Sequence, residues 1–268
     1  MIAPLELLYE PAGLPAFDLP PGIAAIYPGA LGFDEPSVYA NFVSTLDGVV
    51  AIPSIPNSNK LVAGGSASDR YLLGLLRACA DVLVIGSGTM KAAPNSLWTP
   101  EQAFPDAGGD FAELRRRLGR TPSLQLVVLS ASGRLDPGHP ALAAGALVLT
   151  TDEGAARLAP QLPEAATALS LGPGPSLDVA AAIALLRERG HTSILTEGGP
   201  QVLGSLLAAR LVDELFLTLS PLLAGRIPAD PRFAMVEGVD LVPNGPPGGR
   251  LTGVRRDVDH LFLRYELR

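Results

Sequence analysis

The sequence has few of the residues that build disulfides, zinc sites or cationic surfaces. Its single cysteine, Cys79, excludes an internal disulfide, and three histidines far apart in the chain offer no zinc spacing. With 20 basic against 27 acidic residues, the net charge of -7 disfavours nucleic acid and anionic membranes as partners. No positively charged leader opens the chain, and no uncharged apolar run reaches the ~18 residues of a membrane span. We therefore expect a cytoplasmic globular protein without a metal.

Proline is concentrated at the start of the chain. Residues 1–36 contain seven prolines, a density that forbids long helices and disfavours central strands, because proline fixes φ and lacks an N–H donor. From residue 38 the prolines thin out and apolar runs begin. The sequence thus predicts an N-terminal arm over 1–36 and one folded domain over 37–268.

Short β-branched apolar runs alternate in that domain with Ala- and Leu-rich stretches of helical period. This alternation is typical of βα units in a largely parallel sheet, and the uniformly apolar runs predict strands buried on both faces. The predicted strands are Tyr39–Ser44, Val82–Ile85, Leu124–Ser130, Ala146–Thr150, Ala168–Leu171, Ser193–Thr196 and Leu215–Ser220.

The helical stretches and the C-terminal tail complete the expected fold. Residues 250–267 alternate around Asp257-Val258-Asp259 like an antiparallel hairpin. We expect an α/β fold with a mixed, mostly parallel sheet between helical layers. The predicted helices are Asp69–Ala80 with Ser68 as N-cap, Phe111–Leu118, Leu177–Arg189 with Ser176 as N-cap, and Gln201–Ala209.

The sharpest local signal is an apolar strand that turns through two glycines into a helix, Ile194-Leu195-Thr196-Glu197-Gly198-Gly199-Pro200-Gln201. Pro200 suits the first helical position. Glycines let the backbone approach a ligand and leave N–H groups free, while the helix dipole favours an anion such as a pyrophosphate. A tight βα turn with no ligand is the alternative interpretation, and this segment alone does not decide between them.

Two further polar turns follow predicted strands. Gly86-Ser87-Gly88-Thr89 lacks the third glycine of the dinucleotide fingerprint, because Lys91 occupies that position. Ser44-Thr45-Leu46-Asp47-Gly48 ends in an Asp-Gly pair, ordinarily a hairpin turn. Because ligands of open α/β sheets bind beyond the carboxyl ends of the strands, the three turns together predict one site, with Asn41, Ser44 and Asp47 in its wall.

In order along the chain, six segments resemble the reductase domain family of riboflavin biosynthesis, which has a dihydrofolate-reductase-like fold. They span about residues 38 to 226, so the resemblance covers most of the chain. The segments are Ser44-Thr45-Leu46-Asp47-Gly48, Leu76-Arg77-Ala78, Gly86-Ser87-Gly88-Thr89, Thr196-Glu197-Gly198-Gly199-Pro200, Leu211-Val212-Asp213-Glu214-Leu215 and Ser220-Pro221-Leu222-Leu223-Ala224-Gly225.

The resemblance implies an NADPH-dependent reductase of a ribosylamino-pyrimidine that works as a homodimer, through Leu211–Leu223 or the terminal hairpin. Asp47 and Glu197 are the acids inside these polar turns, so they are the expected catalytic residues. We expect Glu197 to hydrogen-bond the substrate ring, and Asp47 either to shape the site and relay a proton or only to brace its own turn. An i,i+4 ion pair with Asp81 is the structural alternative for Arg77. The expected substrate contacts are Asn41, from its place in the site wall, and Ser66, Arg77 and Glu197, from the resemblance. The glycine turns themselves suggest Gly86, Ser87 and Gly198 as cofactor contacts, and the resemblance adds Ser44, Thr89, Gly199, Pro200, Gln201 and Val202.

Two departures from the family pattern concern the substrate. Relatives usually carry a lysine at the position of Asn41, and an Asp-Asp-Pro followed by an arginine where this chain has Ala92-Ala93-Pro94 and then Asn95 to Trp98. The missing cations keep a pterin or dihydrofolate substrate open as an alternative, and a non-catalytic NADPH sensor as a third. For the adenosine end, Ser130-Ala131-Ser132-Gly133-Arg134 offers hydroxyls and a guanidinium to a 2′-phosphate, or is simply a surface loop.

Overall fold

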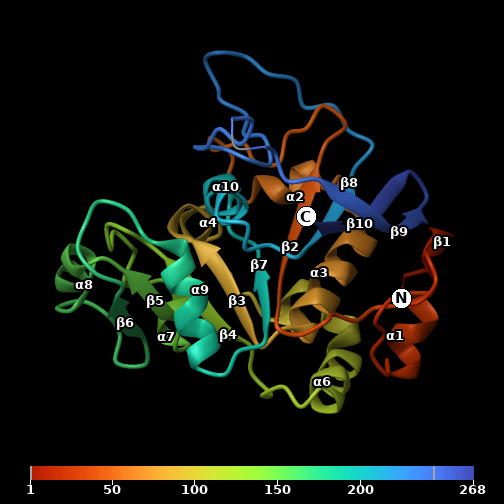
Figure 1. The fold of residues 1–268 in the computed structure, drawn as a ribbon, viewed down its shortest axis with the longest axis horizontal. Helices are drawn as coiled ribbons and strands as arrows, with labels where there is room; N and C mark the ends of the chain where they lie inside the picture. The colour runs from red at the N-terminus through yellow and green to blue at the C-terminus, as the bar shows by residue number, and fades with distance from the viewer. Residues whose placement is uncertain (1, 244) are drawn as a thin grey trace.

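The computed structural model describes residues 2–243 and 245–268, and a ten-stranded sheet forms its centre (Figure 1). The strand order is β1-β9-β10-β8-β2-β7-β3-β4-β5-β6. Strands β2 to β8 pair in parallel, whereas β8, β10, β9 and β1 pair antiparallel. The strands are β1 (Glu6–Tyr9), β2 (Ser37–Ser44), β3 (Val82–Gly86), β4 (Gln125–Leu129), β5 (Leu147–Thr150), β6 (Thr167–Ser170), β7 (Ser193–Thr196), β8 (Glu214–Leu219), β9 (Gly249–Asp257) and β10 (His260–Leu267).

Helices cover both faces of this sheet. Alternate residues of β3 feed the two cores: Leu83 packs in the cluster that contains α3 and α6, and Val84 in the cluster that contains α9 and α10. The expected three-layer fold and its terminal hairpin are confirmed. The helices are α1 (Pro21–Ile26), α2 (Ser58–Val62), α3 (Ala67–Cys79), α4 (Ser87–Ala92), α5 (Pro100–Ala103), η1 (Pro105–Ala107), α6 (Gly108–Arg117), α7 (Pro140–Ala143), α8 (Asp152–Leu158), α9 (Val179–Glu188) and α10 (Pro200–Ala208).

Both predicted N-caps were wrong by two residues. The N-cap of α3 is Ser66, whose hydroxyl accepts the N–H of Asp69 at 3.1 Å, while Ser68 lies inside the helix and donates to Asp257. For α9 the cap is Asp178, which accepts from Ala180 and Ala181, instead of Ser176. Several cap-forming residues stand close together before each helix, so the composition alone does not select among them.

The proline-rich arm is built into the sheet and the core. Strand β1 pairs antiparallel with β9 at the sheet edge. An edge strand tolerates prolines near it, because one of its sides makes no hydrogen bonds to another strand. Ile23 of α1 and Leu31 are fully buried in the core that α3 shares. The buried Arg255 of β9 donates to Glu10 of the arm at 2.5 Å, so both packing and charge anchor the arm.

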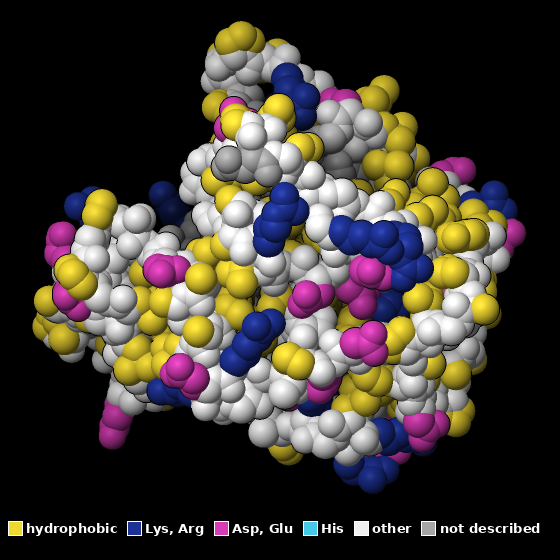
Figure 2. Space-filling view, viewed as in Figure 1, with side chains coloured by type: hydrophobic (Ala, Val, Ile, Leu, Met, Phe, Trp, Pro, Cys, Tyr) yellow, Lys and Arg dark blue, Asp and Glu magenta, His cyan; other side chains and the backbone are white. Residues whose placement is uncertain are grey.

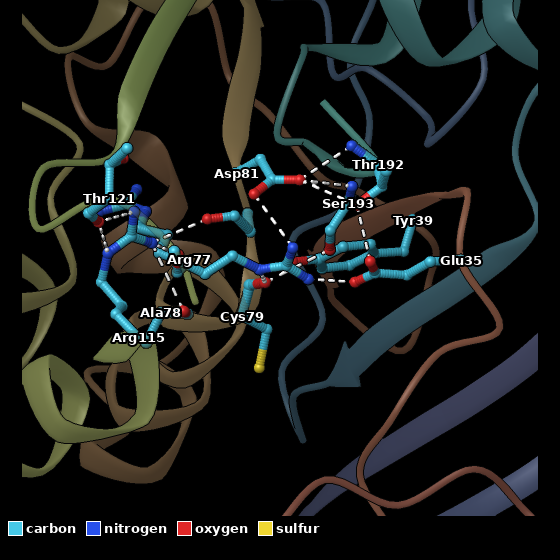
Figure 3. Close-up of polar contacts among 12 residues, drawn as sticks. Glu35, Tyr39, Arg77, Ala78, Cys79, Asp81, Arg115, Thr121, Thr192 and Ser193 are labelled. Atoms are coloured by element: carbon cyan, nitrogen blue, oxygen red, sulfur yellow. Dashed lines mark hydrogen bonds and ion pairs between the residues drawn. The ribbon is translucent and has the colours of Figure 1, made fainter. Parts of the chain in front are cut away.

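Buried arginines hold the amino ends of the central strands (Figure 3). Arg115 is 1% exposed and donates to the carbonyls of Ala80 and Thr121 at 2.8 and 2.7 Å, which neutralises the C-terminal end of α3. Asp81 accepts the backbone N–H groups of Thr192 and Ser193, each at 2.9 Å, and pairs with Arg120. These bonds and the charge on Arg120 help to lower the pKa of Asp81 against the effect of burial.

Within residues 2–243 and 245–268, none of the helices combines the length and the apolar character needed to cross a bilayer. Over the same residues, no three metal-ligating side chains converge. Acidic and basic side chains are interspersed over the face shown in Figure 2, and neither sign forms a continuous patch there.

Candidate active site

The three predicted turns meet at the carboxyl edge of the sheet. Strand β7 lies between β2 and β3, since Thr196 is in register with both Ala40 and Val84. The turn after β7 therefore has the turn after β2 on one side and the turn after β3 on the other. Only short turns join β7 to α10 and β3 to α4, so backbone rather than bulky side chains forms this part of the edge.

The amino end of α10 carries free backbone donors. Gly199 is its N-cap with φ -60° and no side-chain cap, and Pro200 is its first residue. No described residue accepts a hydrogen bond from the N–H of Gln201 or Val202, whereas Leu203 already donates to Gly199. Because two N–H groups point along the positive end of the helix dipole, this corner suits an anion.

Packing accounts for two of the glycines at this edge. A Cβ on Gly86 or on Gly198 would come within 2.8 or 2.5 Å of the Val202 side chain. A Cβ on Gly199 would lie 3.3 Å from the hydroxyl of Thr89, so the two turns nearly touch. Close packing on Val202 thus explains Gly86 and Gly198 without a ligand, while the free amides beyond Gly199 are an additional feature.

Glu197 and Arg77 form a buried, two-pronged ion pair. Arg77 donates from Nε to Oε1 at 2.8 Å and from Nη2 to Oε2 at 2.6 Å, and the side chains are only 6% and 10% exposed. Its Nη1 reaches the carbonyl of Thr99 at 3.2 Å and so ties α3 to the loop before α5. The alternative Arg77–Asp81 pair was wrong, because Asp81 points to the amino end of the sheet and binds Arg120.

Asp47 braces two loops against each other. One carboxylate oxygen accepts the Thr45 hydroxyl at 2.5 Å and the N–H of Ala224 at 3.1 Å, and the other accepts the N–H of Gly225 at 2.7 Å. These hydrogen bonds, that of Thr45 foremost, lower the pKa of Asp47 to about 2. At neutral pH the group is therefore an ionised acceptor with no proton to give.

Of the other predicted residues, two serines make hydrogen bonds to nearby backbone groups, and the rest lie on or directly after β2 and β3. Ser44 is buried and donates to the carbonyl of Thr45 at 2.9 Å, and Ser66 is engaged as the α3 cap. Asn41 is half-buried, and its side chain makes no hydrogen bond to a described residue. Ser87 and Thr89 lie in the first turn of α4, directly after β3.

A polar chamber that the sequence did not reveal lies on the α3 side of the sheet. Phe216 of β8 packs against Tyr39 on that side, so Thr218 of the same strand, and Ser220 directly after the strand, face α3 as well. Both hydroxyls are buried, and that of Ser220 has no hydrogen-bond partner in the described chain. Asp69 of α3 lies against Thr218, and burial raises its pKa to about 6. We call Asn41, Asp69, Glu197, Thr218 and Ser220 the α3-side chamber.

A cavity of about 610 Å³ borders the turn after β3. Its cations come from three elements: Lys91 of α4, Arg134 of the loop after β4, and Arg157 of α8. Arg157 also donates to the carbonyl of Ser132 and pairs with Glu153, so it fixes the loop that carries Arg134. Ser130, two residues before Ser132, has a buried hydroxyl without a partner in residues 2–243 and 245–268. Of the predicted adenosine-end loop, Arg134 lines this cavity.

A mostly parallel sheet between two helical layers, with free helix amides at its carboxyl edge, is typical of α/β nucleotide-binding enzymes. Comparison with known proteins narrows this class. Residues 36–241 match the family model described as the RibD C-terminal domain, and the chain belongs to this family.

Individual relatives agree with that assignment. The chain is 25% identical over 196 residues to the 2,5-diamino-6-ribosylamino-4(3H)-pyrimidinone 5′-phosphate reductase of Archaeoglobus fulgidus, covering 71% of this chain and 83% of that protein. A pyrimidine reductase-like protein of Corynebacterium diphtheriae superposes with TM-score 0.67 at 21% identity, covering 87% of this chain and 92% of that one. Acinetobacter baumannii RibD superposes with TM-score 0.64 at 19% identity, and the match covers 87% of this chain and 58% of that protein. The expected family and fold are thereby confirmed.

Proposed function

We propose that the protein is an NADPH-dependent reductase of a ribosylamino-pyrimidine phosphate. One observation carries the proposal: free amides of α10 lie directly beside a buried carboxylate, Glu197, that Arg77 holds in place. The first feature suits a dinucleotide pyrophosphate, and the second suits a donor-bearing heterocycle. Membership of the RibD C-terminal domain family and the named Archaeoglobus relative support the reaction class.

When bound, the cofactor supplies a hydride, and the protein supplies position and exclusion of water. Gln201 and Val202 are proposed to hold the pyrophosphate, with Ser44, Ser87 and Thr89 beside the nicotinamide half. Glu197 is proposed to accept hydrogen bonds from the substrate ring. Asp47 keeps the turn after β2 in place through Ala224 and Gly225 and takes no part in proton transfer.

The preference for NADPH over NADH is assigned to the cavity beside the turn after β3. Lys91 and Arg134 face it without an ion-pair partner in the described chain, and the unpartnered Ser130 hydroxyl lies in the adjoining loop. A 2′-phosphate carries about two negative charges and accepts several hydrogen bonds, so it suits this set of donors. Asp136 is the acidic side chain in the lining, and its carboxylate is engaged by the N–H of Gly138 at 2.9 Å.

Absorbance at the nicotinamide band tests the reaction directly. Purified protein is mixed with NADPH and the ribosylamino-pyrimidine phosphate, the same compound without its phosphate, or a dihydropterin. NADPH oxidation only with the phosphorylated pyrimidine supports the proposal, whereas turnover of the dihydropterin alone replaces it with a pterin reductase. Cofactor binding without turnover of any of the three identifies a sensor. The dephosphorylated substrate measures how much the phosphate contributes in a chain that has the uncharged Asn41 where relatives have lysine.

A homodimer and a cytoplasmic location belong to the same proposal. At the end of the segment expected to mediate dimerisation, Leu222 and Leu223 are 37% and 75% exposed, and the hairpin exposes Val258 at 77%. Exposed apolar side chains of this kind suit a subunit contact. Cys79 is free and buried, as suits a reducing compartment. Sedimentation of the wild-type protein beside Leu223→Glu tests the contact, since a dimer through this segment dissociates in the variant.

A further inference from the structure

We infer that Asp69 is the general acid of the proposed reduction. The inference rests on the proposed function and on the α3-side chamber. Reduction of a ribosylamine places a hydride on the glycosidic carbon and breaks the bond from that carbon to the ring oxygen. The oxygen keeps the electron pair and takes one proton, so the site needs an acid within reach of the sugar.

The other two carboxyl groups at this edge are engaged. Both oxygens of Glu197 accept from Arg77, and those of Asp47 accept from Thr45 and two backbone amides. Asp69 forms no ion pair with any described residue, although it stands in the first turn of α3 on the side that faces β8. By elimination it is the carboxyl group of the chamber that is free to carry a proton.

The surroundings of Asp69 keep that proton on the group. Burial raises its pKa to about 6, with Glu197 beyond the end of β7 acting as a nearby negative charge in the same direction. Thr218 of β8, His260 of β10 and Arg70 of α3 oppose the rise. A phosphorylated substrate and a dinucleotide bring further negative charge, which raises the pKa again and increases the protonated fraction in the complex.

Unpartnered polar groups beside Asp69 indicate where the sugar lies. Thr218 and Ser220 are 1% and 0% exposed; the Thr218 hydroxyl lies against the Asp69 carboxylate, whereas the Ser220 hydroxyl finds no partner in the described chain. Buried polar groups are normally paired, so the unpaired Ser220 hydroxyl suits a ligand that carries hydroxyl groups. The Asn41 amide on the adjoining strand β2 is also without a hydrogen bond to a described residue. This arrangement places a ribosyl group between β8 and the first turn of α3, with its ring oxygen toward Asp69.

Asp69 also has a plain structural role to be separated from catalysis. It is an acidic residue in the first turn of α3, where a carboxylate stabilises the helix dipole. That role predicts a lower melting temperature for Asp69→Asn and an unaltered pH profile of turnover. A general acid predicts the opposite pattern: a large loss of turnover and a changed pH profile, with unchanged NADPH affinity.

The experiment compares wild type, Asp69→Asn, Asp69→Glu and the exposed control Asp106→Asn over about pH 5 to 9. For wild type we expect kcat to fall as the pH rises past the pKa of the acid in the complex. Asp69→Asn is expected to lower kcat by roughly 10²–10⁴-fold and to abolish that decline. Asp69→Glu is expected to keep the decline at a reduced rate, and Asp106→Asn is expected to match wild type.

Several results would overturn the acid role. Asp69→Asn with kcat within about threefold of wild type does so, because loss of a general acid is a far larger effect. A wild-type kcat that is constant from about pH 6 to 9 also refutes the acid role. This measurement needs no variant, so it remains decisive if Asp69→Asn fails to fold. If wild type does not oxidise NADPH with the pyrimidine at all, the proposed function falls together with the acid. If wild type turns over and Asp69→Asn is equally active, only the general-acid role of Asp69 is refuted and the proposed function stands.

Discussion

Removal of the Arg77 guanidinium should destabilise the protein far more than removal of a surface arginine. The pair with Glu197 has two short charge-assisted hydrogen bonds, and its side chains are only 6% and 10% exposed. Breaking a pair buried this deeply leaves an uncompensated carboxylate, which costs about 3–5 kcal/mol. We therefore expect Arg77→Met to lower the free energy of unfolding by that amount.

The double variant Arg77→Met/Glu197→Gln separates the ion pair from the packing of the two side chains. Without a charge on either side, the loss should be smaller than the sum of the single losses, by a coupling free energy of about 2 kcal/mol. The matched control is the exposed pair of Arg116 with Glu113, whose side chains are 73% and 32% exposed. Loss of that arginine should change stability by less than about 1 kcal/mol.

Urea unfolding followed by tryptophan fluorescence measures this cycle. Trp98 is the single tryptophan, is 4% exposed, and stacks on His139 with ring centroids 5.5 Å apart. It directly precedes Thr99, whose carbonyl accepts from Arg77, so its emission reports on the same region. A coupling free energy below about 0.5 kcal/mol would refute the reasoning, because neighbours in one buried network exceed that value.

Three further predictions concern the cofactor corner, the NADPH cavity and the acid stability of the protein. Gly199→Asp should abolish NADPH binding in a fluorescence titration with little change in melting temperature, because it adds negative charge beside the α10 amides, and Gly109→Asp should bind normally. Arg134→Ala should raise the Kd for NADPH about tenfold and leave that for NADH unchanged, since one charge-assisted bond is worth ~1.5–3 kcal/mol; an equal loss for both cofactors would place the 2′-phosphate elsewhere. Asp47 has a pKa depressed to about 2 from 3.8, so its stabilising contribution is complete above the unfolded value and disappears as the pH falls through about 2. Asp47→Asn should remove that part of the acid transition in a melting series, and an unchanged series would contradict the assignment.

Local signals allowed much of the edge to be predicted from the sequence. The glycine turns after β3 and β7 stand directly behind apolar runs, and the parallel arrangement of those strands places both at one edge. The residues that complete the site are far apart in the chain: Arg77 and Glu197 are separated by 120 positions. Amphipathic period shows that Asp69 belongs to a helix, but not that β8 lies opposite it. The sequence analysis missed Thr218 of β8 for the same reason, because no short segment of sequence shows which strands are neighbours in the sheet.

The prolines of residues 1–36 predict an arm because they break regular structure, whereas the tertiary pairing of β1 with β9 leaves no local signal in the sequence. Cap positions failed for another reason. Ser66 and Ser68 are equally good caps by chemistry, and the backbone conformation that selects Ser66 depends on contacts of the preceding turn.

The pairing of β1 with β9 also determines when β1 can join the sheet during synthesis. Glu6–Tyr9 are synthesised about 240 residues before their partner Gly249–Asp257. Strand β1 must therefore stay without its neighbour while the residues between the two strands are made, and a nascent chain carries that unpaired segment until β9 emerges. A protein truncated before residue 249 should consequently leave the β1 segment sensitive to protease, whereas the chain that includes β9 protects it.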